Sequence, residues 1–345
     1  MLIFLLFLSS GLFLGWSLGA NDGATTFGTA VGSKMLKFKN AAIIASVFVI
    51  IGAVLAGSGG ASTLNTLGNI NTSAGAFIVE LAAALTIYLM VRGKIITSTS
   101  QAIVGAIIGW NFYSLKSTDY GLFSTIASTW IICPILSGLF AISIYYILKS
   151  IFKIAPVSLL KQDVYIRLCL IASGAFSAYA LGANNIANVM GVFVKTNILN
   201  PLPLPIGIEL NSTQVLFLIG AIAIAVGIFT YSKKNTETVG HDIMQISPFV
   251  AWIVVISQSL VLFIFASPAL HNFLLNHNLP TIPLVPVSSS QATIGAIMGI
   301  GLIKGGYCIN WRLIFRMALG WVATPIISGL ICYISLFVLM NIFGI

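Results

Sequence analysis

The sequence predicts an all-α integral membrane protein made of two inverted repeats, with about ten net crossings of the bilayer. Its composition, the charges of its connections and its internal self-similarity support this prediction. Of the 345 residues, 58% are hydrophobic and only 7% are charged, and the mean hydropathy is +1.06. Soluble domains contain about 25% charged residues, so the composition excludes a soluble enzyme, a disordered protein and a nucleic-acid-binding protein, despite the net charge of +9.

Ten apolar segments approach the roughly 20 residues that a membrane-spanning helix needs. The first has no basic leader before it, so we expect a span there and not a cleaved signal peptide. The ten segments comprise residues 2–19, 41–57, 74–91, 95–112 and 123–148 in the first half, and residues 164–181, 215–231, 248–266, 282–303 and 313–340 in the second.

Basic residues mark alternate connections between these segments. Connections 58–73, 196–214 and 267–281 contain no Lys or Arg. Since basic loops stay in the cytoplasm, we expect five crossings per half, opposite orientations of the two halves, and both termini on the extracytoplasmic side of the cell membrane. The predicted units are residues 1–150, a cytoplasmic linker 151–163, and residues 164–345. The basic residues used here are Lys34, Lys37, Lys39, Arg92, Lys94, Lys149, Lys153, Lys161, Arg167, Lys233, Lys234, Lys304, Arg312 and Arg316.

Self-similarity indicates the same two halves. Gly-Ala-Asn-Asp at residues 19–22 recurs as Gly-Ala-Asn-Asn at residues 182–185, and eight of twelve positions are identical between residues 98–109 and 288–299. A third block, Trp130, Pro134, Ser137 and Gly138, recurs as Trp321, Pro325, Ser328 and Gly329. Three blocks in the same order favour an internal duplication.

The two Gly-Ala-Asn blocks and the two serine-rich blocks are expected to interrupt their helices. Non-helical backbone inside a bilayer is tolerated only against protein or water, and paired interrupted helices form the substrate site of inverted-repeat carriers near the midplane. The alternative is that the small residues simply allow helices to pack closely. The Asn, Asp and Gln in these blocks favour a binding site.

The expected site combines a carboxylate with neutral hydrogen-bond donors. Of the seven acidic residues, only Asp22 and Glu80 are placed within the membrane, where a carboxylate usually marks an ion or proton pathway. Glu80 could bind a cation, take a proton or pair with a polar neighbour. An anion would be held by helix N-termini and by hydroxyl groups. The donors are Ser98, Thr99, Ser100, Ser288, Ser289 and Ser290; the cation ligands are Asp22 with amide oxygens of Asn21, Asn184, Asn185 or Gln101. These groups predict cation-coupled anion uptake, with Na⁺ favoured.

At these residues the sequence resembles the inorganic phosphate transporter (PiT) family. Residues 19–25 and 182–188 resemble its two Asn-containing motifs, and residues 98–101 and 288–291 resemble its two hydroxyl-rich motifs. The resemblance implies an inverted-repeat secondary transporter with two re-entrant hairpins, a homodimer, and import of phosphate with Na⁺ or H⁺ and no other cofactor. The cation-binding positions implied by the resemblance are Asn21, Asp22, Asn184 and Asn188, and the anion-binding positions are the six hydroxyl residues. Further candidates from this sequence are Thr25, Asn185 and Glu80 for the cation and Gln101 and Gln291 for the anion. Na⁺ itself is assigned to Asp22, Asn21 and Asn184.

Four residues depart from the family pattern. Thr25 replaces an Asn, Asn185 replaces an Asp, and Gln101 and Gln291 replace His. Sulfate permeases related to the family have a similar Asn-Asn second motif, so sulfate is the rival substrate, whereas Asp22 favours phosphate. An anion channel is the alternative from another class. An intramembrane enzyme is disfavoured because the apolar segments contain no His to act as a base.

Overall fold

The computed structural model describes residues 2–93, 95, 97–154, 158–203, 205, 207, 209–233, 243–244 and 246–343. Lys94 and Lys234, which contribute to the predicted orientation, lie outside the described residues, as do Glu237, His241, Asp242 and residues 155–157 of the predicted linker.

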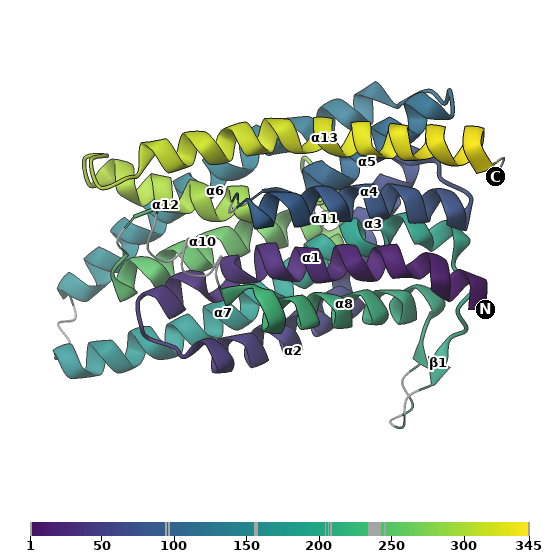
Figure 1. The fold of residues 1–345 in the computed structure, drawn as a ribbon. Helices are drawn as coiled ribbons and strands as arrows, with labels where there is room; N and C mark the ends of the chain where they lie inside the picture. Colours follow the sequence, from purple (N-terminus) through teal and green to yellow (C-terminus); the bar gives the residue numbers. More distant parts are fainter. Residues whose placement is uncertain are drawn as a thin grey trace.

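The described chain is a bundle of helices that share one long axis (Figure 1). Eight of its helices are long and apolar enough to cross a membrane, so the protein is a multi-pass membrane protein. They are α1 (Leu2–Gly32), α2 (Phe38–Ala56), α4 (Ser73–Arg92), α6 (Tyr120–Ile154), α7 (Leu159–Met190), α8 (Ser212–Tyr231), α10 (Pro248–Ala266) and α13 (Trp311–Phe343). Shorter elements are α3 (Ser58–Gly68), the 3₁₀ helix η1 (Gly191–Thr196) and α11 (Pro268–Asn276).

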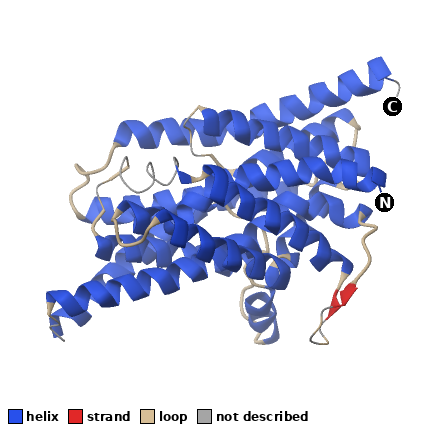
Figure 2. Cartoon of the chain, turned by 60° about the horizontal axis from the view of Figure 1, so that its bottom comes forward, coloured by secondary structure: helices blue, strands red, loops and turns tan. Residues whose placement is uncertain are grey.

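The only strands among the described residues are β1 (Leu202–Pro203) and β2 (Glu209–Leu210), which form one small antiparallel pair (Figure 2). The prediction of a helical membrane protein is therefore confirmed, apart from this hairpin in a connection.

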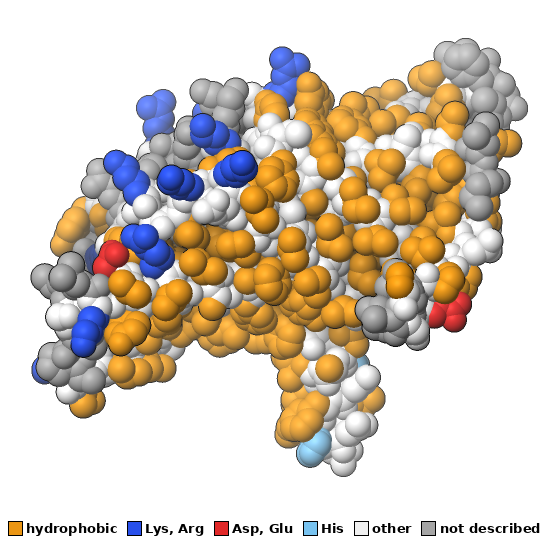
Figure 3. Space-filling view, turned by 90° about the horizontal axis from the view of Figure 1, so that it is seen from below, with side chains coloured by type: hydrophobic (Ala, Val, Ile, Leu, Met, Phe, Trp, Pro, Cys, Tyr) orange, Lys and Arg blue, Asp and Glu red, His pale blue; other side chains and the backbone are white. Residues whose placement is uncertain are grey.

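The two ends of the bundle differ in charge. Both termini lie at one end (Figure 1), whereas most Lys and Arg side chains visible in Figure 3 gather towards the opposite end, with a broad hydrophobic band between. Exposed basic residues in the connections α1–α2 and α12–α13, and in the adjoining ends of α6 and α7, account for this basic end. The separation agrees with the predicted alternation of basic and non-basic connections; which end faces the cytoplasm stays a prediction.

Two shorter helices complete the bundle: α5 (Thr99–Tyr113) and α12 (Ser289–Ile303), of 15 residues each. At about 1.5 Å per residue, each reaches only part of the way across a hydrocarbon layer of roughly 30 Å. Each follows a stretch without regular secondary structure, residues 279–288 in the case of α12. In the described residues, each expected hairpin therefore consists of a non-helical stretch leading into one half-helix. With the eight long helices, these two segments would give the expected ten crossings.

The prediction that both Gly-Ala-Asn blocks interrupt their helices is wrong. Helix α1 runs without a break through residues 19–25, and α7 runs through residues 182–188. Their glycines serve close packing: a Cβ atom on Gly19 would lie 2.0 Å from the carbonyl oxygen of Ile224, and one on Gly182 would lie 2.1 Å from that of Val49. Since the backbone N–H groups stay paired within the helices, the motifs must donate hydrogen bonds through their side chains.

The two halves of the chain interlock through the half-helices. Helix α5 packs on α13 and α12 packs on α6, so each half-helix lies against the last helix of the other half. A Cβ atom on Gly105 would lie 2.1 Å from the carbonyl oxygen of Pro325, and one on Gly295 would lie 2.1 Å from that of Pro134. These matched contacts hold the two half-helices so that their N-termini meet inside the bundle.

Candidate functional site

Two asparagines fix the stretches that precede the half-helices. The Asn21 amide nitrogen donates to the carbonyl oxygen of Thr97 at 2.8 Å, and the Thr97 N–H donates back to the Asn21 Oδ1 at 3.5 Å. Asn184 makes the same pair of bonds with Val287, at 2.7 and 3.0 Å. Backbone groups that have left a helix inside a membrane need such partners. The two motif asparagines therefore position the starts of α5 and α12.

The half-helices begin against each other. The Ser100 hydroxyl donates to the Val287 carbonyl oxygen at 3.1 Å, and the Ser290 hydroxyl donates to the Thr97 carbonyl oxygen at 2.9 Å. Each carbonyl thus accepts from an asparagine of its own half and from a serine of the other. From this junction α12 extends towards the basic end and α5 towards the end with the termini (Figure 1).

The junction is electrically positive although no Lys or Arg of the described residues is buried. The first N–H groups of a helix have no partner within it, and each helix N-terminus carries about half a positive charge. Ser98 and Ser288 cap the two starts by accepting from the N–H groups of Gln101 and Gln291, both at 3.3 Å. The earlier N–H groups of both starts remain suited to an anion.

Asp22 places a carboxylate beside this junction. Its side chain is only 2% exposed; Oδ1 accepts from the Asn21 amide nitrogen at 2.9 Å and Oδ2 accepts from the Thr99 hydroxyl at 3.2 Å. Two neutral donors compensate poorly for a buried negative charge. A cation or a proton at this carboxylate would complete the compensation.

Four buried side-chain amide atoms around the junction have no hydrogen-bond partner among the described residues. Three are acceptors, the side-chain oxygens of Gln101, Gln291 and Asn188, and one is a donor, the amide nitrogen of Asn185. Buried polar groups are nearly always paired with protein, water or a ligand. These atoms therefore indicate where bound ions would complete the site.

The structure brings the predicted motif residues into one buried cluster, all at most 3% exposed. The Asn188 amide nitrogen donates to Ser100 at 3.0 Å and to Asn185 at 2.9 Å. The Thr25 hydroxyl donates to the backbone oxygen of Asp22 at 2.7 Å. The members of the cluster are Asn21, Asp22, Thr25, Ser98, Thr99, Ser100, Gln101, Asn184, Asn185, Asn188, Ser288, Ser289, Ser290 and Gln291.

Glu80 does not join this cluster. It is fully buried in α4, and both of its carboxylate oxygens lack a hydrogen-bond partner in the described part of the chain. The three roles considered for it from the sequence therefore stay predictions.

Gln258 in α10 is a further polar residue at this cluster, which was not predicted from the sequence. Its amide nitrogen donates to the backbone oxygen of Thr25 at 2.9 Å and to the Ser177 hydroxyl at 2.5 Å, and its oxygen accepts from the Thr293 hydroxyl at 2.6 Å. The side chain thus ties together α1, α7 and α12. The sequence did contain a signal for this role, namely a single Gln within the apolar segment 248–266. Such a residue needs a specific partner, because polar groups inside a membrane must be paired.

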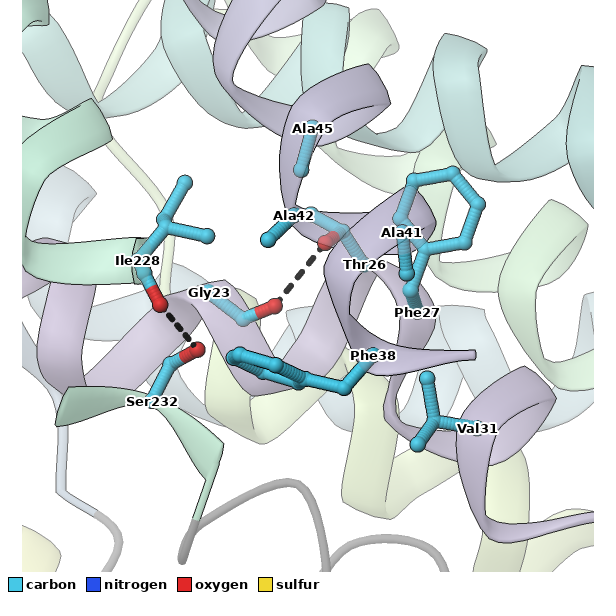
Figure 4. A pocket seen from close by; sticks show the side chains of 10 residues that line it. All are labelled: Gly23, Thr26, Phe27, Val31, Phe38, Ala41, Ala42, Ala45, Ile228 and Ser232. Carbon is cyan, nitrogen blue, oxygen red and sulfur yellow. Dashed lines mark hydrogen bonds between the residues drawn. The ribbon is translucent and has the colours of Figure 1, made fainter. Parts of the chain in front are cut away.

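A pocket beside the motif of α1 is distinct from this cluster (Figure 4). It lies between α1, α2 and α8, and most of its lining is apolar. The Thr26 and Ser232 hydroxyls in it donate to carbonyl oxygens of their own helices, Gly23 and Ile228, at 2.9 and 2.8 Å.

Comparison with known proteins gives the family of the chain. Residues 18–332 match the model of the phosphate transporter family. The chain belongs to the phosphate transporter family. It is also 31% identical to the "Putative phosphate permease" of Methanocaldococcus jannaschii, over 92% of this chain and 91% of that protein. It is therefore a transporter of this family and not an enzyme.

One further relative and one solved structure are informative about substrate and fold. The chain is 29% identical to the sulfate permease CysP of Bacillus subtilis, over 97% of this chain and 88% of CysP. A solved structure described as the sodium-dependent phosphate transporter superimposes with a TM-score of 0.78 at 19% identity, over 99% of this chain and 100% of that one. This structural similarity shows that the present chain has the same fold as that transporter.

Proposed function

We propose that this protein is a secondary transporter that imports inorganic phosphate across the cell membrane together with a cation, Na⁺ or H⁺. One observation carries the proposal. The N-termini of two half-helices meet inside the bundle, joined through Ser100 and Ser290, beside the buried carboxylate of Asp22. Membership of the phosphate transporter family supports phosphate as the anion.

The anion would bind at the two helix starts. Converging N–H groups and helix dipoles suit a phosphate or sulfate group, and the amides of Gln101 and Gln291 lie in the same first turns. Ser100 and Ser290 already donate to backbone carbonyl oxygens. Their role would be to align the two starts, while the N–H groups and the other hydroxyls contact the anion.

The cation would bind at Asp22. A carboxylate with neighbouring amide and carbonyl oxygens is the kind of ligand set that transporters offer to Na⁺ near the midplane, and the unpaired Asn188 oxygen belongs to the same cluster. A positive ion here would offset the cost of bringing a charged anion out of water. Na⁺ is favoured over H⁺ by the number of oxygen ligands. Asn21 and Asn184 would support the site by holding the helix starts, and Thr25 by bonding to the Asp22 backbone.

Alternating access would follow from two inverted repeats, residues 1–150 and 164–345. The matched bonds of Asn21 with Thr97 and of Asn184 with Val287 support this division, as do the matched glycine contacts of α5 and α12. The termini at one end of the bundle and the basic residues at the other (Figures 1 and 3) support extracytoplasmic termini. The family resemblance supports a homodimer.

Sulfate is the second candidate substrate. The Asn184-Asn185 pair in the second motif and the similarity to the sulfate permease CysP favour it. Asp22 in the first motif agrees with the phosphate transporter pattern, which keeps phosphate ahead.

Uptake by proteoliposomes tests the function. The full chain is reconstituted, labelled phosphate and sulfate are supplied separately and in competition, and inward Na⁺ or proton gradients are imposed. We expect saturable phosphate uptake that stops when the cation gradient is removed. Uptake of sulfate alone would show that sulfate, and not phosphate, is the substrate. Unitary anion currents would show that the protein is a channel. Liposomes without protein are the control.

A further inference from the structure

Positions 22 and 185, which are equivalent in the two halves, carry a carboxylate and an amide respectively. Asp22 and Asn185 each follow the asparagine that holds the start of a half-helix, in α1 and α7 respectively. We propose that Asn185 donates to the transported anion and that only the Asp22 half binds a cation, so that one cation is coupled to each anion. The inference rests on the proposed function and specifies the ion stoichiometry of the same site.

The hydrogen bonds around Asn185 fix the orientation of its amide. The Ser100 hydroxyl donates to the Val287 carbonyl oxygen at 3.1 Å, which can only accept. Having used its single proton, Ser100 can only accept from Asn188, so the Asn188 atom that faces it at 3.0 Å is the amide nitrogen. Amide orientations have to be derived from such networks, and here a backbone carbonyl provides the starting point.

The same nitrogen of Asn188 faces Asn185 at 2.9 Å, so the Asn185 atom in this contact is its oxygen. The amide nitrogen of Asn185 is left with no partner in the described residues, although the side chain is only 1% exposed. A buried donor without a partner is costly. Its position, two hydrogen bonds away from the start of α5, suits an anion held at the helix junction.

The corresponding group in the first half has the opposite character. Both oxygens of Asp22 are acceptors, which already receive the Asn21 amide and the Thr99 hydroxyl. A cation gains from a carboxylate and is repelled by an N–H donor. Asp22 therefore provides a cation site, whereas Asn185 provides a further donor for the anion.

Charge balance leads to the same stoichiometry. One cation neutralises the Asp22 carboxylate. A second cation at Asn185 would have no carboxylate partner and would lie close to two positive helix N-termini, in a place where water cannot screen the charges. At Asn185 the second half thus contributes a donor to the anion and no second cation site.

The stoichiometry follows directly from the balance point of the wild-type transporter. The balance point is the phosphate gradient at which net uptake driven by a given cation gradient stops. Proteoliposomes are held at zero membrane potential, and an inward gradient of Na⁺, or of protons if these drive uptake, is opposed by an outward gradient of phosphate. A tenfold cation gradient is balanced by about a tenfold phosphate gradient if one cation is coupled, and by about a hundredfold gradient if two are coupled. We expect the first value; the second would overturn the inference.

Two variants test the role of Asn185. Asn185→Asp should move the balance point towards the two-cation value and weaken phosphate binding. Asn185→Ala should raise the phosphate KM about tenfold, the loss of one hydrogen bond to a charged group, with an unchanged balance point. Asn200→Ala, an exposed amide in a connection, is the matched control. The wild-type measurement and Asn185→Ala keep the test decisive if Asn185→Asp does not fold.

Unchanged phosphate affinity in both Asn185 variants, with an unchanged balance point in Asn185→Asp, would contradict the inference. These outcomes presuppose that the wild type takes up phosphate or sulfate. Failure of the wild type to take up either anion under any cation gradient would contradict the proposed function itself, and the two failures are therefore distinguishable.

Discussion

At the scale of single residues, the site depends on which polar atoms are already bonded. Asn21 uses both its amide nitrogen and its oxygen on the backbone of Thr97, and Asn184 does the same with Val287. Asp22 accepts from the Asn21 amide and the Thr99 hydroxyl and is the acidic group of the cluster. The first two residues are thus suited to holding backbone in place, and Asp22 is suited to holding a charge.

Replacing Asp22 with Asn should abolish cation-coupled uptake while the protein still folds. The amide keeps the shape of the side chain and removes the acidic group at the junction, so uptake should fall by more than about tenfold. Labelled phosphate uptake under an imposed Na⁺ gradient measures the effect. Asp163→Asn, which removes an exposed carboxylate paired with Arg167, should behave as the wild type. Undiminished uptake by Asp22→Asn would refute the assigned role.

Replacing Asn184 with Ala should lower stability. It leaves the N–H and the carbonyl oxygen of Val287 with fewer partners inside the bundle, and an unsatisfied buried group costs about 1–3 kcal/mol. Thermal unfolding of the detergent-solubilised protein measures the loss. The exposed Asn200→Ala variant should unfold at the wild-type temperature. Equal unfolding temperatures for both variants would show that the bonds to Val287 are dispensable.

At the scale of elements, the half-helices are held by backbone contact with the last helix of the other half. Their glycines allow this approach, because the carbonyl oxygens of Pro325 and Pro134 occupy the space of a side chain at Gly105 and Gly295. Pro134 and Pro325 both lie inside long helices, α6 and α13.

Alanine at Gly105 or Gly295 should therefore separate a half-helix from its neighbour. Each added Cβ would come within 2.1 Å of a carbonyl oxygen, and overpacking of this kind typically costs about 1–3 kcal/mol. We expect lower unfolding temperatures and weaker phosphate uptake. Gly121→Ala is the control, because its nearest neighbour, an Asp119 carboxylate oxygen, is 3.3 Å away and the site is exposed. Wild-type behaviour of both half-helix variants would show that the contacts give way easily.

At the scale of the whole molecule, the distribution of charge indicates how the protein lies in the membrane. The basic end and the end with the termini are separated by a hydrophobic band (Figure 3). The exposed Cys308 follows Lys304 and precedes Arg312 in the connection from α12 to α13. The positive-inside rule predicts that this connection faces the cytoplasm.

A membrane-impermeant maleimide should consequently label Cys308 only after intact cells are made permeable. Cys308→Ser should remove this labelling. An Asn200→Cys variant in that background, placed in the non-basic connection between η1 and β1, should be labelled without permeabilisation. Labelling of Cys308 from outside intact cells would reverse the proposed orientation.

Particular residues show how far the sequence could lead. The repeated blocks identified Asn21, Asp22, Asn184 and the serine-rich starts, and the structure places all of them in one cluster. The sequence did not reveal that α1 and α7 remain continuous, because a glycine that breaks a helix and one that admits a neighbouring backbone look alike. Gln258 was missed because its partners are distant in sequence.

The sequence by itself determined that the protein lies in a membrane, that matching blocks recur in its two halves, and which polar residues lie within apolar segments. These properties follow from composition and spacing, which need no folded chain to be observed. Only the tertiary structure decided which atoms of those residues are bonded and which are left free, as for the amides of Asn184 and Asn185. Hydrogen bonds between segments distant along the chain depend on how the helices pack, and no local pattern specifies them.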